Sequence, residues 1–181
     1  MTTDTTAASW REIERTTVFS KFGRSVDRVV FELPDGRTEE FYLKSERPAG
    51  AVLALTTDQR VILARQYRPG PSRVLSELPG GFLEPGEQAA DAVARELLEE
   101  TGYQGEVRAV GPYWHDAYSD TRRFAFVAIG CTKVAEPTPE RTEFIDVVTV
   151  GLEEFRTRML RMGEMTDTAA AYLALDHLRL L

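Results

Sequence analysis

The amino-acid sequence predicts an α/β fold in which helices flank a mixed β-sheet. Short strand-like runs and three helical stretches follow one another without the regular rhythm of βαβ units, which indicates a sheet of mixed direction. The 181 residues suit one domain, and 43% hydrophobic with 28% charged residues is typical of a globular chain that buries a sizeable core.

Strands are expected from Thr16 onward. Apolar and polar side chains alternate through residues 26–33, and a Leu-Pro-Asp-Gly-Arg turn separates this run from residues 39–43. A second apolar pair, residues 51–55 and 61–67, surrounds a Thr-Asp-Gln turn. The remaining predicted elements are short strands at 107–110, 124–129 and 145–150, and helices at 88–101, 152–162 and 166–180.

Charge and cysteine content exclude several classes of protein. A net charge of −7 and a pI near 5.0 argue against nucleic acid as a partner, because contacts to its phosphates require a basic surface. The single Cys131 cannot form an internal disulfide and suits a reducing compartment, so we expect a cytoplasmic protein. Because no apolar run approaches the roughly 20 residues that span a bilayer, no membrane association is expected. Residues 1–9 are predicted to be a flexible tail.

The predicted helix at 88–101 concentrates negative charge. Its apolar face, expected to contact the core, consists of Ala90, Val93, Ala94, Leu97 and Leu98. Glu96, Glu99 and Glu100 lie three and four residues apart on a neighbouring face, so their carboxylates repel one another. They also lie close to the C-terminal end of the helix, where the dipole disfavours negative charge. A divalent cation with oxygen ligands, Mg²⁺ or Mn²⁺, would relieve both penalties. The alternative is a solvated acidic face that Arg95 partly compensates.

The residues before the helix favour the metal site. Gly80-Gly81 allows the backbone to approach a ligand closely, and Pro85-Gly86 forces a tight turn. From Gly81 the chain continues with five residues, then Glu87, then seven residues, then Arg-Glu-Leu-Leu-Glu-Glu-Thr-Gly-Tyr. This pattern of 23 residues resembles the complete signature box of the Nudix hydrolases.

The resemblance implies an α/β/α sandwich with a mixed sheet and an N-terminal antiparallel strand extension. The box would form a loop–helix–loop that holds divalent metal. By position, the ligands would be the carbonyl oxygen of Gly80 and the carboxylates of Glu96, Glu99 and Glu100. Arg95 would orient these carboxylates, and Glu87 would brace the loop, so that Glu87, Arg95 and Glu99 count among the catalytic residues.

The resemblance extends over residues 10–181, as a single Nudix domain. Gln66-Tyr67-Arg68 and Glu77-Leu-Pro-Gly-Gly81 are similar to the ADP-ribose and nucleotide-sugar diphosphatase branch. That branch implies a homodimer to which strands in residues 10–46 contribute, with residues 47–181 as the catalytic core. Arg68 would bind phosphate, and Glu77 would be a second polar contact to substrate. Their ordinary alternatives are a surface charge at a strand end and a carboxylate on an edge strand.

The loop at 112–121 departs from the pattern of that branch. Ala117 and Tyr118 stand where a proline is expected, and Thr121 replaces a glutamate, which weakens ADP-ribose as the specific substrate and leaves other nucleoside diphosphate sugars open. Trp114 and Tyr118 are candidates for stacking on a base or sugar, with core packing as the alternative. His115 has no ligand partner nearby in sequence, so a zinc site is not expected.

The predicted reaction also needs a general base. By resemblance, a glutamate beyond the box takes this role, and Glu143 fits best, with Glu140 second. The expected function is metal-dependent hydrolysis of a nucleoside diphosphate sugar to a nucleoside monophosphate and a sugar phosphate. The alternatives are a house-cleaning hydrolase of nucleoside triphosphates or dinucleoside polyphosphates, and a non-catalytic nucleotide-sugar sensor.

Overall fold

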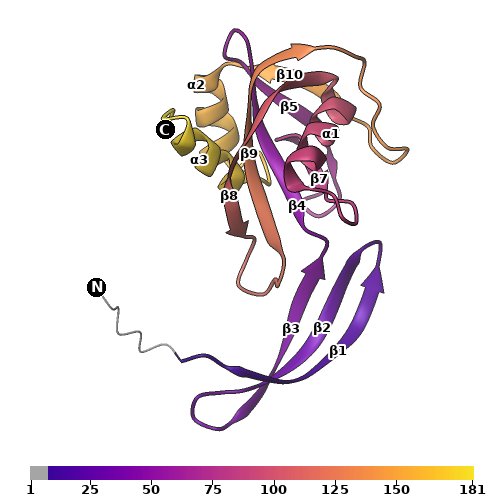
Figure 1. Ribbon diagram of the computed structural model, residues 1–181, viewed down its shortest axis with the longest axis vertical. Helices are drawn as coiled ribbons and strands as arrows, with labels where there is room; N and C mark the ends of the chain where they lie inside the picture. Colours follow the sequence, from indigo (N-terminus) through magenta and orange to yellow (C-terminus); the bar gives the residue numbers. More distant parts are fainter. Residues whose placement is uncertain (1–7) are drawn as a thin grey trace. The chain divides into compact units, whose positions relative to one another are not determined.

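The computed structural model describes residues 8–181, which divide into two compact units (Figure 1). The first unit comprises residues 8–47 and Trp114–Thr121, and the second comprises Pro48–Tyr113 and Arg122–Leu181. Most of the tail predicted at residues 1–9 lies outside the described residues. The sequence-based boundary between residues 46 and 47 lies one residue before the boundary between the units, and the 114–121 segment was not expected in the first unit.

The first unit is an antiparallel meander of β1 (Arg11–Lys21), β2 (Arg24–Glu32) and β3 (Thr38–Glu46). Phe22 and Gly23 both have positive φ, 53° and 71°, as a tight hairpin turn requires. β1 begins at Arg11, five residues earlier than predicted. Every residue of β1 is exposed, so neither face of the strand has to be apolar. The sequence therefore lacks the alternation of apolar and polar residues that would have marked where β1 begins.

The second unit contains a mixed sheet in the order β10-β5-β4-β9-β8, with β6 paired to β5 and β7 paired to β4. The central β4 runs parallel to β9 and antiparallel to β5, and all eight of its residues are buried, as expected for a strand covered on both faces. The strand bounds are β4 Ala49–Thr56, β5 Val61–Arg68, β6 Arg73–Glu77, β7 Gly80–Phe82, β8 Tyr103–Trp114, β9 Arg122–Lys133 and β10 Asp146–Val150.

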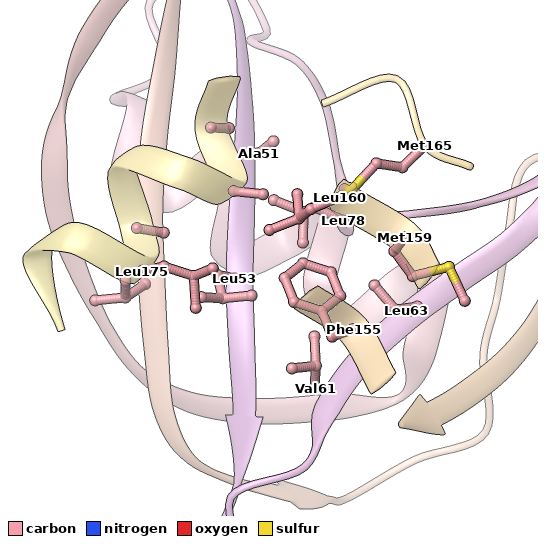
Figure 2. Packing of buried hydrophobic residues seen from close by; sticks show 14 of the residues in the cluster. Ala51, Leu53, Val61, Leu63, Leu78, Phe155, Met159, Leu160, Met165 and Leu175 are labelled. Atoms are coloured by element: carbon pink, nitrogen blue, oxygen red, sulfur yellow. The ribbon is translucent and has the colours of Figure 1, made fainter. Parts of the chain in front are cut away.

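Helices cover both faces of this sheet. On one face α1 (Ala89–Thr101) packs Val93 and Leu97 against Val52 and Ala54 of β4. On the other face lie α2 (Leu152–Glu154), the π-helical turn η1 (Phe155–Leu160) and α3 (Thr168–His177). Figure 2 shows the fully buried Phe155 among Leu53, Val61 and Leu63. The predicted mixed sheet between helices is confirmed.

Several local predictions were wrong. Strands β6 and β7 were not expected, because β6 is short and flanked by prolines and glycines, and two of the three residues of β7 are glycines. The helix predicted at 152–162 is a three-residue α-helical turn that continues as a π-helix, and the helix predicted at 166–180 is limited to Thr168–His177. The predicted apolar face of α1 is also displaced. Its buried residues are Ala92, Val93, Leu97, Glu100 and Thr101, whereas Ala90, Ala94 and Leu98 are exposed.

Candidate active site

The C-terminal half of α1 presents the carboxylates of Glu96 and Glu100 toward Gly80 and Gly81 of β7. Gly102 ends the helix in a left-handed conformation, with φ of 75°, and its N–H donates to the Leu98 carbonyl at 2.8 Å. Val93 and Leu97 hold the helix against the sheet. This rotation of α1 places Glu100 on the buried side of the helix.

Gly80 and Gly81 bring the backbone into direct contact with these carboxylates. The Gly80 N–H donates to Oε2 of Glu100 at 2.9 Å. A Cβ on Gly81 would lie 2.5 Å from Oε1 of Glu96, and one on Gly80 would lie 2.8 Å from the Cα of Ala51. Any larger residue at either position would therefore displace β4 or the carboxylate of Glu96.

Arg95 is the centre of a dense group of ion pairs. Its Nε and Nη2 donate to the two carboxylate oxygens of Glu87 at 3.0 and 3.1 Å. Nη1 donates to Glu96 at 2.9 Å and to Glu99 at 3.0 Å. Glu87 in turn accepts the N–H of Glu84 at 2.8 Å, which fixes the turn before α1. These contacts allow Arg95 to orient the glutamates and Glu87 to brace the turn, and both roles stay predictions.

The carboxylates on α1 occupy an environment that disfavours their charge. Glu100 is only 3% exposed, and burial raises the pKa of its carboxyl to about 8, with repulsion from Glu96 and Glu143 adding to the rise. Burial also raises the pKa of Glu96, and the Arg95 guanidinium opposes that rise. Acidic side chains whose pKa is strongly shifted by burial and by neighbouring charges are often found at functional sites.

Glu143 lies within electrostatic reach of this cluster, although it belongs to the loop before β10. Its charge contributes to the raised pKa of both Glu96 and Glu100. The backbone N–H of Glu140 donates to Oε2 of Glu143 at 3.0 Å, which orients the carboxylate. Glu143 is half-buried, whereas the side chain of Glu140 is exposed.

Arg68 and Glu77, on the paired strands β5 and β6, form a second ion pair. Nε of Arg68 donates to Oε2 of Glu77, whose side chain is only 1% exposed, while that of Arg68 is 38% exposed. The other carboxylate oxygen, Oε1, accepts the hydroxyl of Thr166, which precedes α3. The Arg68 charge opposes the rise in the pKa of Glu100, so this guanidinium lies near the carboxylates of α1.

The two predicted aromatic contacts belong to the first unit. Trp114 and Tyr118 are 57% and 55% exposed, so neither is a core residue of that unit. The backbone around Tyr118 is tied to β3, because the Lys44 N–H donates to the Tyr118 carbonyl at 2.8 Å. Lys44 also forms an ion pair with Asp116.

Comparison with known proteins assigns this arrangement to a family. The sequence profile of the NUDIX domain matches residues 45–169, which contain α1 and the whole glutamate cluster. The chain belongs to the Nudix family. This confirms the predicted resemblance and the prediction of a Nudix hydrolase.

Two Nudix relatives match nearly the whole chain. The ADP-ribose pyrophosphatase of Bacillus subtilis is 30% identical over 94% of this chain and 92% of its own length. The ADP-sugar pyrophosphatase of Mus musculus is 30% identical over 93% of this chain and 82% of its own length. A crystal structure described as an ADP compounds hydrolase has a TM-score of 0.78 with 18% identity and covers 97% of both chains, so it shares the fold.

Nudix hydrolases generally need a divalent metal, and the residues on α1 fit one. Among residues 8–181, no group of three His, Cys, Asp or Glu side chains is arranged to hold a metal, and the Arg95 guanidinium bridges Glu96 and Glu99. The donors are nevertheless hard oxygens from one helix, and the absence of a side chain on Gly81 allows the Glu96 carboxylate to lie against the backbone.

Sequence reasoning missed Thr166 and Asp167, which the Nudix pattern does not include. Asp167 is half-buried, and burial raises the pKa of its carboxyl to about 6, with repulsion from Glu77 adding to the rise. A Thr-Asp pair before a helical stretch indicates only a helix start. The contact between Thr166 and Glu77 joins residues 89 positions apart, and one sequence carries no signal for such a pair.

Proposed function

We propose that the chain hydrolyses the diphosphate linkage of a nucleoside diphosphate sugar such as ADP-ribose, yielding a nucleoside monophosphate and a sugar phosphate. The main support is the intact glutamate cluster on α1, held by Arg95 and backed by Gly80-Gly81. The pyrophosphatase names of the two full-length relatives support the class of substrate.

The metal in this proposal is Mg²⁺ or Mn²⁺. The residues that would hold it are the carbonyl of Gly80 and the carboxylates of Glu96, Glu99 and Glu100. When bound, the cation supplies neutralisation of the diphosphate oxygens and activation of water. Because the chain carries a net charge of −7, a dianionic substrate needs local positive charge in order to bind.

The proton acceptor in this proposal is Glu143. The oxygen of a water molecule attacks one phosphorus, and the bond from that phosphorus to the bridging oxygen breaks. The water proton passes to the Glu143 carboxylate, and the released phosphate keeps the bridging oxygen. Support comes from the electrostatic reach of Glu143 to Glu96 and Glu100 and from the Glu140 N–H that orients it.

In the same proposal Arg68 binds a phosphate oxygen of the substrate, and Trp114 and Tyr118 contact the base or sugar. Arg68 is supported by its half-exposed guanidinium near the α1 carboxylates. Trp114 and Tyr118 are supported by the large exposed areas of their rings.

The test is a product assay with ADP-ribose, ADP-glucose, GDP-mannose, UDP-glucose and a nucleoside triphosphate, each with Mg²⁺, with Mn²⁺ and with chelator. We expect metal-dependent release of a nucleoside monophosphate from at least one sugar nucleotide. Cleavage of the triphosphate alone would replace the proposal with a house-cleaning hydrolase. Tight binding of a sugar nucleotide without cleavage would replace it with a sensor.

We also propose a homodimer that covers the sheet of the first unit. All eleven residues of β1 are exposed, and Ile13, Val18 and Phe19 are each about half exposed or more, with Phe22 at 80%. A three-stranded sheet needs one covered apolar face for stability. Light scattering coupled to gel filtration should give about twice the chain mass of 20.3 kDa. A mass equal to one chain would contradict the dimer.

A cytoplasmic location is part of the proposal as well. Cys131 is buried with its thiol reduced, and burial raises its pKa to about 11, which makes it unreactive. No helix in the described part of the chain is long and apolar enough to cross a membrane.

A further inference from the structure

We propose that Thr166 and Glu77 act as positioning residues, which aim the Arg68 guanidinium at a phosphate group of the substrate. This role rests on the proposed function of the site. It assigns a task to the segment that precedes α3, which lies outside the glutamate box in sequence.

The geometry fixes Arg68 from one side only. Glu77 binds Nε of Arg68 with one carboxylate oxygen and the Thr166 hydroxyl with the other. Among the described residues, the two Nη atoms of Arg68 make no hydrogen bond. Nη1 and Nη2 therefore remain as the donors that can bind a phosphate in a paired geometry.

The burial of Glu77 explains why Thr166 is needed. The Glu77 side chain is only 1% exposed, so water cannot replace a lost partner of either oxygen. Without the hydroxyl, Oε1 would be buried and unpaired, and the carboxylate would be free to rotate away from Nε of Arg68. The contact therefore determines the direction of the guanidinium as well as the stability of the pair.

The side chains of Thr166 and Asp167 do not cap α3. The helix begins at Thr168, and although Asp167 occupies the N-cap position, its side chain makes no capping hydrogen bond. Thr and Asp are preferred at helix starts because their oxygens accept backbone N–H groups. Here the Thr166 hydroxyl donates to Glu77 and also lies within hydrogen-bond reach of the Asp167 carboxyl, so it serves the cluster around Arg68 and not the start of the helix.

The experiment compares Thr166→Val, which removes the hydroxyl and keeps the shape, with Thr166→Ser, which keeps the hydroxyl. Thr168→Val serves as a matched control two residues away. Each is assayed for kcat and KM with the best sugar nucleotide. Each is also assayed for the Kd of inorganic pyrophosphate with Mg²⁺ by calorimetry. Thr166→Val is then repeated in an Arg68→Ala background. Thr166→Ala replaces Thr166→Val if the latter does not fold.

We expect Thr166→Val to raise KM and the pyrophosphate Kd by about tenfold, the usual effect of losing a hydrogen bond to a charged group, with kcat changed little. Thr166→Ser and Thr168→Val should resemble the wild type, and the Thr166→Val effect should vanish in the Arg68→Ala background. An equal effect in both backgrounds, or an unchanged Kd, would overturn the positioning role.

The two proposals fail in different ways. A wild-type protein that binds pyrophosphate and hydrolyses no sugar nucleotide refutes the proposed function, while the Kd of Thr166→Val still decides the positioning role. A wild-type protein that hydrolyses sugar nucleotides, with Thr166→Val unchanged in KM and Kd, refutes the positioning role alone. The positioning role would also be overturned if the wild-type protein did not bind pyrophosphate.

Discussion

Arg95 and Arg68 are both held by glutamates, but the two guanidinium groups are used in different ways. All three nitrogens of Arg95 donate to protein oxygens, from Glu87, Glu96, Glu99 and the Phe82 carbonyl. Arg68 is bound through Nε alone, by Glu77. The first arginine is fully occupied and acts as a brace, whereas the second keeps its outer donors available.

The difference teaches how one site can serve two partners of opposite charge. Around Arg95 the acids outnumber the base, so the α1 cluster retains negative charge for a cation. Around Arg68 one buried carboxylate neutralises the guanidinium without occupying its Nη atoms, which suits an anion. Three substitutions test the α1 cluster, and two test the second cluster, which consists of Arg68, Glu77, Thr166 and Asp167.

Glu100→Gln should have the largest effect. Removing a predicted metal ligand should cost more than the roughly 10–100-fold loss seen for outer-shell partners, so we expect kcat/KM to fall by more than about 10²-fold. The same change should stabilise the metal-free protein. A carboxyl whose pKa rises from 4.5 to about 8 on folding loses stability as pH increases through that range. Gln removes this penalty, and at pH 8 the Tm should rise by a few degrees.

Differential scanning fluorimetry without metal, together with steady-state kinetics, measures both effects of Glu100→Gln. Full activity with an unchanged Tm would show that Glu100 is neither a ligand nor a destabilised acid. Glu106→Gln is a suitable control, because Glu106 is exposed and its pKa is lowered by Arg108.

Glu143→Gln should rank second and shows whether the α1 cluster extends to the loop before β10. Loss of a general base typically reduces kcat by about 10²-fold. Mn²⁺ affinity, measured by calorimetry, should change little, because Glu143 is not one of the proposed ligands. Glu140→Gln is the matched control, since Glu140 contributes its backbone N–H to Glu143 and not its side chain. Near wild-type turnover of Glu143→Gln would remove it from this role.

Arg95→Lys should reduce kcat/KM by about 10–100-fold and weaken Mn²⁺ binding, because lysine cannot donate to Glu87 and the two α1 glutamates at once. Arg68→Lys should leave Mn²⁺ affinity unchanged and raise KM instead. Equal effects of the two substitutions on metal affinity would remove the distinction between a bracing and a presenting arginine.

The two clusters also differ in how far the sequence predicted them. The contacts of Arg95 with Glu87, Glu96 and Glu99 join residues within one turn and one helix. The spacing predicted only that the glutamates are neighbours, and the roles of Glu87 and Arg95 were implied by the resemblance to the Nudix box. Arg68, Glu77 and Thr166 meet only through strand pairing and the position of the segment before α3, which local patterns do not encode. The apolar face of α1 was misplaced because periodicity assigns burial to apolar residues. Here the sheet and the glycine pair bury Glu100 instead of Leu98.

Asp167→Asn should have the smallest effect and acts on stability within the Arg68 cluster. Burial and then repulsion from Glu77 raise the pKa of the Asp167 carboxyl from 3.8 to about 6, while Arg123 and Arg68 oppose the rise. The contribution of Asp167 to the free energy of unfolding is therefore largest below pH 3.8, and it decreases as the pH rises through about 6. Relative to wild type, the Tm of Asp167→Asn should be higher at pH 7 than at pH 4, as urea or thermal unfolding at the two pH values would measure. A difference that does not depend on pH would mean that folding leaves the pKa of Asp167 unchanged, with Arg123 and Arg68 balancing the effect of its burial.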